Sequence, residues 1–547
     1  MNKIENKIKE IVKSSVNEVF DYQVDLADIV IEQPKNKEHG HYATNVAMRL
    51  VKQLKNKPVV LAQQLVDALN SNEYFEKVEI AGPGFINFFV KQQYIVEIIN
   101  DVLSLKDDYG TVTTKHEDKI NLEYVSVNPT GDLHPGHARG AAYGDSLARI
   151  LTKAGYEVTR EYYVNDAGNQ IYNLALSIYT RYHQLFNIEI EMPNDGYHGD
   201  DIIQMASKLK EKYQDKFLNQ PFEELEDFLR EYGIEEELNK IKEDLDSFDV
   251  HFDVWTSERA IYKKGLIEEV LDKLVRQDLT YKAEDALWLK TTLFNDDKDR
   301  VLIKSDGTYT YLTPDIAYHQ DKLNRGFNKL INVLGADHHS YVTRLTAAIT
   351  ALGYPEGTLD VEIVQLVRMI KDNEEFKLSK RSGKAVALRD LLDEAGKDAI
   401  RYFFASRALE SQMDLDLDLA IKTSNENPVY YAQYAHARMH SILENAKSFS
   451  NTDRLDLLTN SKELELLILI NDFTNCVVDA ASARQPQKVC NYIQKLASSF
   501  HSFYNECKVI DYEQEELSKQ RVKLVEATKT TLKNALLLVG VSAPDNM

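Results

Sequence analysis

Asn128-Pro129-Thr130-Gly131-Asp132-Leu133-His134-Pro135-Gly136-His137 is the stretch that decides the fold. Upstream of it, 119–127 is largely apolar and rich in β-branched residues, which predicts a strand. Downstream, 137–154 has the pattern of a helix that is ended by Gly155. A strand that enters a helix through a Pro/Gly turn presents free backbone N–H groups at the positive end of the helix dipole, where phosphate binds. The two histidines of the turn can donate hydrogen bonds to phosphoryl oxygens.

The spacing His-x-Gly-His is weak evidence by itself, because a structural turn can carry two incidental histidines. A second basic element follows roughly 240 residues later, Lys377-Leu378-Ser379-Lys380-Arg381-Ser382-Gly383-Lys384. A solvated basic loop is the simpler interpretation of this run, although lysine is also a point charge suited to neutralising a departing pyrophosphate. The order and separation of the two elements favour the catalytic interpretation.

The two elements resemble the HIGH and KMSKS motifs of class I aminoacyl-tRNA synthetases and related nucleotidyltransferases, with Pro135 in the second position of the first motif. The resemblance implies that both elements act on the phosphates of ATP, which is bound as its Mg²⁺ complex. The implied catalytic residues are His134, His137, Lys377 and Lys380. The implied ATP-binding residues are His134, Gly136, His137, His338 and Ser379.

Composition describes an ordinary globular protein of 547 residues, with 43% hydrophobic and 28% charged residues. The net charge of −22 argues against a generally basic nucleic-acid binder, and we expect no DNA partner. Neither a membrane-spanning apolar run nor a signal peptide is expected, so a cytoplasmic location is predicted. The three cysteines lie far apart without a CxxC pair, so neither a zinc site nor any other metal site of the protein itself is expected.

Patterns along the chain predict an α/β protein of several domains. Its centre is a doubly wound parallel sheet of Rossmann type, belonging by resemblance to the HIGH superfamily, with an N-terminal α+β domain and a C-terminal all-α bundle. The expected parts are an N-terminal domain 1–110, a catalytic domain 111–169 and 296–375, a helical insertion 170–295, a region 376–424 with the basic loop and a tRNA stem contact, and a helical anticodon-binding domain 425–547.

Beyond the class motifs, the chain resembles the arginyl-tRNA synthetase family over essentially its full length. The segments that carry this resemblance are Glu123–Gly131, Asn165–Gln170, Tyr309–Ala317, Gly335–His339 and Asp398–Phe404. The last is similar to the "DALR" element of that family, with Ile400 where leucine is usual. The chain also ends close to the family's usual terminal proline and methionine.

Arginine is a planar cation with donors in a fixed fork, so its site needs carboxylates. Glu123 precedes the histidine turn, and Asp315 follows Tyr311 by one helical turn. The resemblance implies that Glu123, Tyr311 and Asp315 hold the guanidinium and that Asn128 binds near the α-amino group. For Asp315 an N-cap role stays open beside this one. His338 is expected at the carboxyl end of a strand, where open sheets bind ligands, although a structural role is about as plausible.

The resemblance also implies residues that bind tRNA. Phe85 and Asn87 would stack on and read a base of the D-loop, and Tyr431, Tyr434 and Tyr504 would pack anticodon bases, with Arg438 and the terminal Met547 nearby. Core packing of Phe85 and of the tyrosines, and a simple strand position for Asn87, remain alternatives. The implied partners are tRNA(Arg), L-arginine and ATP, and we expect a monomer that binds no membrane.

The predicted function is ligation of L-arginine to tRNA(Arg), through arginyl-adenylate and transfer to the 3′-terminal adenosine, with tRNA required for activation. A nucleotidyltransferase of small metabolites would have no need of the two outer domains, and a silent tRNA-binding relative would not need both histidines and both lysines. A cysteine-specific synthetase would need zinc ligands. The glutamate and glutamine enzymes would need a basic site rather than Glu123 with Asp315.

Overall fold

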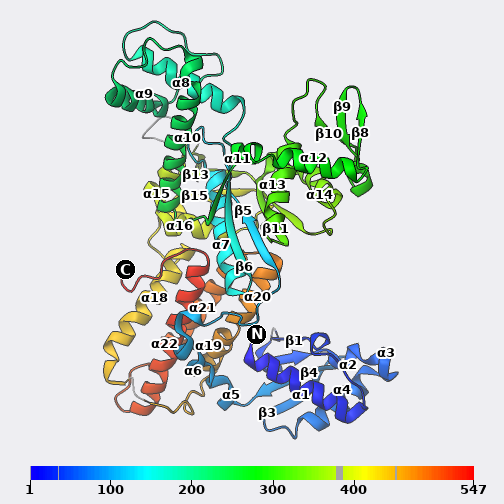
Figure 1. The fold of residues 1–547 in the computed structure, drawn as a ribbon. Coiled ribbons are helices and arrows are strands. Elements are labelled where there is room, and N and C mark those ends of the chain that lie inside the picture. Colours follow the sequence, from blue (N-terminus) through cyan, green and yellow to red (C-terminus); the bar gives the residue numbers. More distant parts are fainter. Residues whose placement is uncertain (1, 35, 377–385, 450–451) are drawn as a thin grey trace. The chain divides into compact units, whose positions relative to one another are not determined.

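The computed structural model describes residues 2–34, 36–376, 386–449 and 452–547 (Figure 1). Lys377, Ser379 and Lys380 therefore lie outside the described residues. The chain forms two compact units, which are treated separately below. One comprises 1–114, 153–155 and 422–547, and the other comprises Lys115–Thr152 and Tyr156–Ile421.

A five-stranded parallel sheet is the centre of the second unit. Its order is β12 (Leu359–Val364), β11 (Lys329–Gly335), β5 (Lys119–Glu123), β6 (Glu157–Val164) and β7 (Val254–Ser257). The chain builds outward from β5 to β6 and β7, and later adds β11 and β12 on the other side. This confirms the expected doubly wound sheet and puts its topological switch point between β5 and β11.

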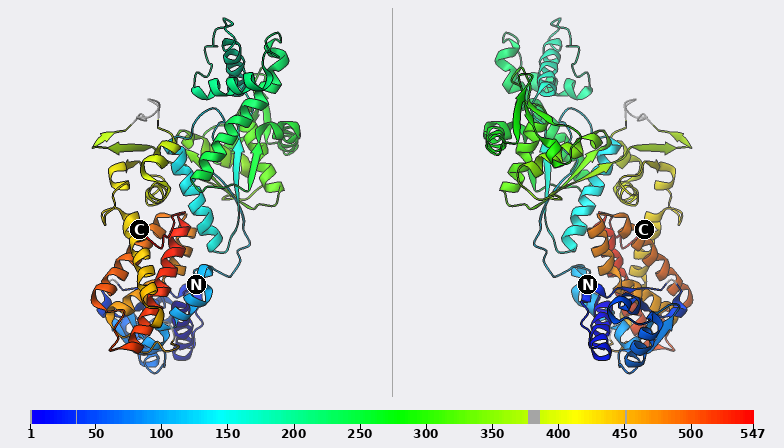
Figure 2. Two further views of the ribbon diagram at one scale, coloured as in Figure 1. Left: turned by 90° about the vertical axis from the view of Figure 1, so that its left-hand side faces the viewer. Right: turned by 90° about the vertical axis from the view of Figure 1, so that its right-hand side faces the viewer.

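Helix α7 (Pro135–Lys153) follows β5 and runs along the sheet, shown in cyan in Figure 2. The helix packs closely against Tyr124 because Gly144 has no side chain. A Cβ at this position would come within 2.3 Å of the Tyr124 ring. Gly155 takes a φ of +96° and ends the turn after the helix, as the sequence predicts.

The predicted strand 119–127 is shorter in the structure and ends at Glu123. The reason is the backbone beyond it, where Val125 (φ +67°) and Ser126 (φ +42°) adopt left-handed conformations that interrupt the strand. The strand β6 holds this turn, because the Tyr162 hydroxyl bonds both the N–H and the carbonyl of Val127, at 3.2 and 3.0 Å. Ser126 Oγ accepts a further bond of 3.0 Å from the Tyr163 N–H.

The segment 170–295, expected as a helical insertion, contains strands as well as helices. Helices α8 (Asn169–Gln184), α9 (Asp200–Tyr213) and α10 (Phe222–Ser247) pack around a shared apolar core at the top of Figure 1. The chain then returns to the main sheet as β7 and continues into α11 (Glu258–Lys263) and α12 (Leu266–Arg276). A small antiparallel sheet follows, made of β8 (Thr280–Ala283), β9 (Ala286–Leu289) and β10 (Arg300–Ile303).

Turn chemistry explains why the sequence did not reveal the β8–β9 hairpin. Glu284 and Asp285 both have positive φ, +51° and +55°, as a two-residue type I′ turn requires. Asn-Gly or Asp-Gly is the usual signal of such a turn, whereas Glu-Asp reads as a charged helix surface.

The rest of the second unit surrounds the sheet. Its remaining elements are α13 (Leu312–Asn324), α14 (Val342–Ala351), β13 (Val367–Lys371), β14 (Glu374–Glu375), α15 (Leu388–Ala395), α16 (Lys397–Ala405), β15 (Met413–Asp416) and α17 (Leu417–Ala420). Helix α16 contains the DALR-like element, and its Arg401 is completely buried. Arg401 donates to Asp145 Oδ2 of α7 at 2.5 Å and to the Phe248 carbonyl, just after α10, at 2.8 Å. One guanidinium thus joins three helices that are far apart in the sequence.

The first unit joins the N-terminal α+β region to the C-terminal helices. Its antiparallel sheet has the order β1 (Ile31–Glu32), β2 (Tyr42–Thr44), β4 (Phe85–Val90) and β3 (Phe75–Ala81). Its N-terminal helices are α1 (Lys3–Phe20), α2 (Val46–Arg49), α3 (Val51–Leu54), α4 (Pro58–Leu69), α5 (Gln92–Val96) and α6 (Ile98–Leu105). The bundle consists of α18 (Pro428–Asn445), α19 (Ser461–Asn471), α20 (Phe473–Ala483), α21 (Gln487–Glu506) and α22 (Glu515–Leu538). The all-α bundle confirms the expected fold class.

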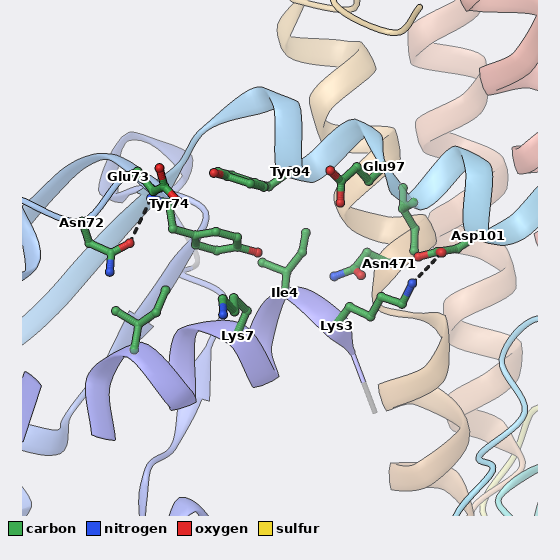
Figure 3. Close-up of a pocket in the computed structure, with 12 residues that line it drawn as sticks. Lys3, Ile4, Lys7, Asn72, Glu73, Tyr74, Tyr94, Glu97, Asp101 and Asn471 are labelled. Carbon is green, nitrogen blue, oxygen red and sulfur yellow. Dashed lines mark hydrogen bonds and ion pairs between the residues drawn. The ribbon is translucent and has the colours of Figure 1, made fainter. Parts of the chain in front are cut away.

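Polar contacts anchor helix α1 within this unit. Asn2 Oδ1 caps the helix and also accepts a hydrogen bond from buried Asn471 of α19, at 2.5 Å. Lys3 Nζ reaches Asp101 of α6 at 2.5 Å, beside a cavity of about 420 Å³ in which the rings of Tyr74 and Tyr94 stack at 4.4 Å (Figure 3). The cavity belongs to this unit and contains none of the predicted catalytic residues.

One stretch among the described residues, Ser461–Ala483, is apolar and long enough to cross a membrane by composition alone. In the structure it forms two helices, α19 and α20, on either side of Asp472. Leu466, Leu467 and Ile470 are fully buried, so the stretch has the character of a core segment of the bundle.

Candidate active site

Of the predicted catalytic residues, the two that the structure describes, His134 and His137, lie in the turn that follows the carboxyl end of β5, next to β11 in the sheet. Glu123 is the last residue of β5, and the histidine turn follows it. The neighbouring strand β11 ends at Gly335 and leads into the short 3₁₀ turn Ala336–Tyr341, which carries His338. Open parallel sheets bind ligands at this edge and at this switch point, because the backbone there diverges to both faces.

The two histidines of the turn are held as neutral donors. Nδ1 of His134 accepts from the Gly136 and His137 N–H groups at 3.1 and 3.3 Å, and Nδ1 of His137 accepts from the His134 N–H at 3.3 Å. An Nδ1 that accepts carries no proton, so in both rings the proton lies on Nε2. Desolvation lowers the pKa of His134, and burial together with the neighbouring ring lowers that of His137 to about 3. The rings stack at 3.3 Å.

Gly136 allows this arrangement. A Cβ at this position would lie 2.9 Å from Cε1 and 3.1 Å from Nδ1 of His134. Any larger residue would therefore displace the ring and break the hydrogen bonds that fix its tautomer.

Three carboxyl groups from three elements form what we call the acidic cluster: Glu123 of β5, Glu258 of α11 and Asp315 of α13. Burial, opposed by a hydrogen bond from Tyr341 and reinforced by the charges of Glu123 and Glu258, raises the pKa of Asp315 to about 7. Burial and the charge of Asp166 raise the pKa of Glu258 to about 6. The ionised forms of Asp315 and Glu258 are therefore disfavoured, and a bound cation would favour them.

In two of these three carboxylates, one oxygen accepts a hydrogen bond from another side chain. Oε2 of Glu123 pairs with Nζ of Lys322 at 2.6 Å, and both side chains are buried. Oδ2 of Asp315 accepts from the Tyr341 hydroxyl. Among the described residues, no hydrogen bond reaches Oε1 of Glu123 or Oδ1 of Asp315.

Other predicted residues take different positions. Asn128 lies in the turn after β5 and donates to Gln170 Oε1 at 2.8 Å. His338 lies 3.4 Å from Asp337, with its ring edge-on to Tyr341.

Tyr311 is the N-cap of α13 and is 88% exposed, so the structure does not bring it into the acidic cluster. The N-cap alternative for Asp315 is wrong, because Asp315 lies inside the first turn of α13.

The sequence analysis missed Glu258, Lys322 and Tyr341. A signal for Lys322 was present: Asp315, His319 and Lys322 follow the spacing i, i+4, i+7, which places them on one face of a helix. Polar residues at that spacing on a buried helix mark a polar face inside the protein. Glu258 and Tyr341 had no comparable signal, since Glu258 begins the short helix α11 and Tyr341 ends the 3₁₀ turn Ala336–Tyr341.

The helix α10 of the inserted segment also reaches the histidine turn. Lys240 Nζ lies 2.8 Å from Asp132 Oδ1, and Arg389 of α15 bonds Asp244 of α10 at 2.8 and 3.0 Å. Beside Lys240, Glu237 is fully buried, and neither of its carboxylate oxygens has a hydrogen-bond partner among the described residues. Burial and the charges of Asp201 and Asp132, opposed by Lys240, raise the pKa of Glu237 to about 7.

The predicted tRNA-binding residues belong to the other unit. Phe85 is partly buried in the central strand β4, and Asn87 is 3% exposed, with an amide nitrogen that has no partner among the described residues. Tyr431 packs on His501, and the guanidinium of Arg438 lies over the rings of Tyr434 and Tyr504. The structure thus brings three of the residues expected near the anticodon into contact. Met547 is exposed.

Three family models match this chain. The model described as "tRNA synthetases class I (R), catalytic domain" matches residues 98–440, more than half of the chain. "Arginyl tRNA synthetase N terminal domain" matches 6–90, and "DALR anticodon binding domain" matches 432–547. The chain belongs to the arginyl-tRNA synthetase family.

Individual relatives agree with this assignment. Arginine–tRNA ligase of Bacillus subtilis is 52% identical over 99% of this chain and 98% of its own length. Arginine–tRNA ligase 1 of Halalkalibacterium halodurans is 52% identical over 95% of both chains. The solved arginyl-tRNA synthetase of Thermus thermophilus superposes with a TM-score of 0.78 over 99% of this chain and 100% of its own, and at 22% identity it supports the fold. In the described residues, no group of three or more His, Cys, Asp or Glu side chains is arranged to hold a metal ion.

Replacing Glu237 with glutamine should stabilise the protein at alkaline pH. The folded-state pKa of about 7 lies above the ordinary 4.5, so the stability contributed by this group is present below about pH 4.5 and is lost as pH rises through 7. The free energy of unfolding that is lost in this way is at most about 3 kcal/mol. Thermal unfolding should show a higher midpoint for Glu237→Gln than for the wild type at about pH 8 and little difference at about pH 5.

Glu235→Gln, on the exposed face of the same helix, is the matched control and should leave both midpoints unchanged. An equal shift of Glu237→Gln at the two pH values would contradict the assignment of the effect to ionisation.

Proposed function

We propose that this chain ligates L-arginine to tRNA(Arg) in two steps. Arginine first reacts with ATP, bound as its Mg²⁺ complex, to give arginyl-adenylate and diphosphate, and the arginyl group then passes to the 3′-terminal adenosine of the tRNA. The observation that carries the proposal is the acidic cluster beside two neutral histidines at a helix N-terminus, because it combines a cation site with a phosphate site at one sheet edge.

Arginine would bind through the free carboxylate oxygens. Oε1 of Glu123 and Oδ1 of Asp315 come from different elements and can each accept from a different nitrogen of one guanidinium fork. Glu258 adds negative charge near Asp315. Asn128 would bind near the α-amino group, and Tyr311 would have to leave its exposed position to contact the substrate.

The first step needs no nucleophile from the protein, because the carboxylate of arginine attacks the α-phosphate of ATP and diphosphate leaves. His134 and His137 would donate their Nε2 protons in hydrogen bonds to phosphoryl oxygens as negative charge develops there. Both rings are already neutral and fixed, so no reorganisation is required during the step. Gly136 and His338 would lie next to the nucleotide. Mg²⁺ would neutralise the phosphates when it is bound with ATP.

Lys377 and Lys380 would neutralise the diphosphate, and Ser379 would hold the conformation of their segment. These roles rest on the sequence resemblance, since the three residues lie outside the described part of the chain. In the second step the tRNA would bind through Phe85 and Asn87 and, at the anticodon, through Tyr431, Tyr434, Tyr504 and Met547. We also infer that activation requires tRNA, and that the protein acts as a cytoplasmic monomer without a zinc ion.

The direct test is aminoacylation of total tRNA with each of the twenty amino acids in turn. We expect charging with arginine alone, because lysine lacks the planar fork and uncharged analogues would leave buried carboxylates unpaired. Charging with another amino acid would contradict the specificity, and no charging with any would contradict the enzymatic function itself.

Arginine binding should release protons near neutral pH. The guanidinium favours the ionised forms of Asp315 and Glu258, whose pKa values of about 7 and about 6 must fall on binding. Affinity should therefore rise as pH increases through 6 to 7 and level off above about pH 8. Calorimetry in two buffers of different ionisation enthalpy measures the released protons.

Asp315→Asn should weaken arginine binding by about 2–5 kcal/mol and remove most of the proton release. An affinity that is independent of pH in the wild type would contradict the role of the acidic cluster.

His137→Ala should slow adenylate formation by about 3–4 kcal/mol in activation free energy, because one positioned donor to the phosphates is lost. ATP–diphosphate exchange in the presence of tRNA measures this step. Lys380→Ala should also slow adenylate formation. Exchange at the wild-type rate by that variant would refute the role of the lysine. His251→Ala, which removes an exposed histidine paired with Asp246 and Asp249, is the control.

A further inference from the structure

Lys322 and Tyr341 each occupy one oxygen of a carboxylate in the acidic cluster. Lys322 Nζ bonds Oε2 of Glu123 at 2.6 Å, and the Tyr341 hydroxyl bonds Oδ2 of Asp315. The two donors come from different elements, since Lys322 lies on α13 and Tyr341 ends the turn after β11. As a result each carboxylate is left with one acceptor oxygen instead of two.

Lys322 is fixed tightly in this position. Its side chain is completely buried, its Nζ lies 4.3 Å from the centre of the Tyr318 ring, and Asn332 Oδ1 is 3.4 Å away. A fully buried lysine is rare unless it is paired, and here the pair is directed at the predicted substrate site rather than at the surface. The charged and titratable groups around the cluster include Glu123, Glu161, Tyr163, Asp166, Glu258, Tyr262, Asp315, Tyr318, His319, Lys322, Arg325, Tyr341 and Arg344.

We propose that Lys322 and Tyr341 are positioning residues that make the site selective for a planar guanidinium over a primary ammonium. The proposal rests on the proposed function, in which Glu123 and Asp315 hold the side chain of arginine. By committing one oxygen of each carboxylate, the two donors leave Oε1 of Glu123 and Oδ1 of Asp315 as two separate single acceptors.

The physical basis is the shape of the two cations. A guanidinium presents several N–H donors in one plane and can reach two acceptors on different elements at once. An ammonium is a compact point charge, and it would gain most from a carboxylate with both oxygens free. Lys322 already supplies such a charge to Glu123, so a lysine substrate would have to place a second ammonium against the same carboxylate.

Burial mainly raises the pKa of Asp315, and the hydrogen bond from Tyr341 and, to a smaller extent, the charge of Lys322 oppose that rise. Without that charge Asp315 should hold its proton to higher pH, and arginine should bind well only in more alkaline solution. A residue with a purely structural role would not shift the pH profile of substrate binding in this way.

The test compares Lys322→Met, which keeps the length of the side chain, with the wild type in ATP–diphosphate exchange with total tRNA present. At about pH 7 the KM for arginine should rise about tenfold while kcat changes less than about threefold, and the rise should shrink toward about pH 9. The ratio of kcat/KM for arginine to that for lysine should fall about tenfold.

Tyr341→Phe removes only the hydroxyl that holds Asp315 and should fold even if Lys322→Met does not. It should give the same pattern with a smaller rise in the KM for arginine and a smaller loss of selectivity against lysine. In this variant too, kcat should be nearly unchanged, because neither residue touches the reacting phosphate.

Arg325→Met is the matched control, since Arg325 lies on the same helix and makes a two-pronged pair with buried Glu161 at 2.9 and 2.8 Å. It should lower thermal stability but leave the KM for arginine and the selectivity ratio unchanged. If Lys322→Met and Tyr341→Phe both keep the wild-type KM, pH profile and selectivity, or if Arg325→Met matches their changes, the proposal is overturned. A wild-type protein that does not activate arginine would instead overturn the proposed function.

Discussion

The junction between β5 and α7 is the constraint on which the rest of the catalytic unit depends. Val125 and Ser126 turn the chain out of the sheet with left-handed backbones, and the Tyr162 hydroxyl holds the result in place. A β-branched residue with positive φ is strained by about 1–3 kcal/mol, and such strain persists only where the surroundings fix it. Here the turn places Glu123, Asn128 and the two histidines at a single edge of the sheet.

The acidic cluster and the two histidines of the turn differ in charge, although both lie at the same edge of the sheet. The chain carries a net charge of −22, yet the negative charge at the sheet edge is concentrated in one cluster, while the nearby histidines stay neutral donors. Raised carboxyl pKa values and lowered imidazole pKa values have the same physical origin, since burial disfavours the charged form of both. In the proposed function this difference has a use: the carboxyl groups would receive a cation, and the imidazoles would donate to an anion.

Polar contacts connect the inserted helices to this edge. Lys240 joins α10 to the histidine turn through Asp132, and Arg401 joins the end of α10 to Asp145 of α7. The Arg401–Asp145 pair is fully buried, and removing one of its partners would leave a charge without compensation. The DALR-like element therefore contributes its arginine to the catalytic unit itself.

The sequence by itself determined the doubly wound sheet, the helix after the histidine turn, the helical C-terminal bundle and the family, because periodicity and motif spacing are local properties of the chain. It also placed Glu123 on the strand before the histidine turn and Asp315 one helical turn after Tyr311, but not the end of that strand at Glu123. It did not reveal the β8–β9 hairpin, whose turn residues are untypical. Only the tertiary structure decided that Lys322 and Tyr341 hold the two carboxylates, that Glu258 joins them, and that Tyr311 stands apart. Those pairings join elements roughly 25 to 200 residues apart, and no local pattern records which buried charges will meet once the strands and helices are assembled.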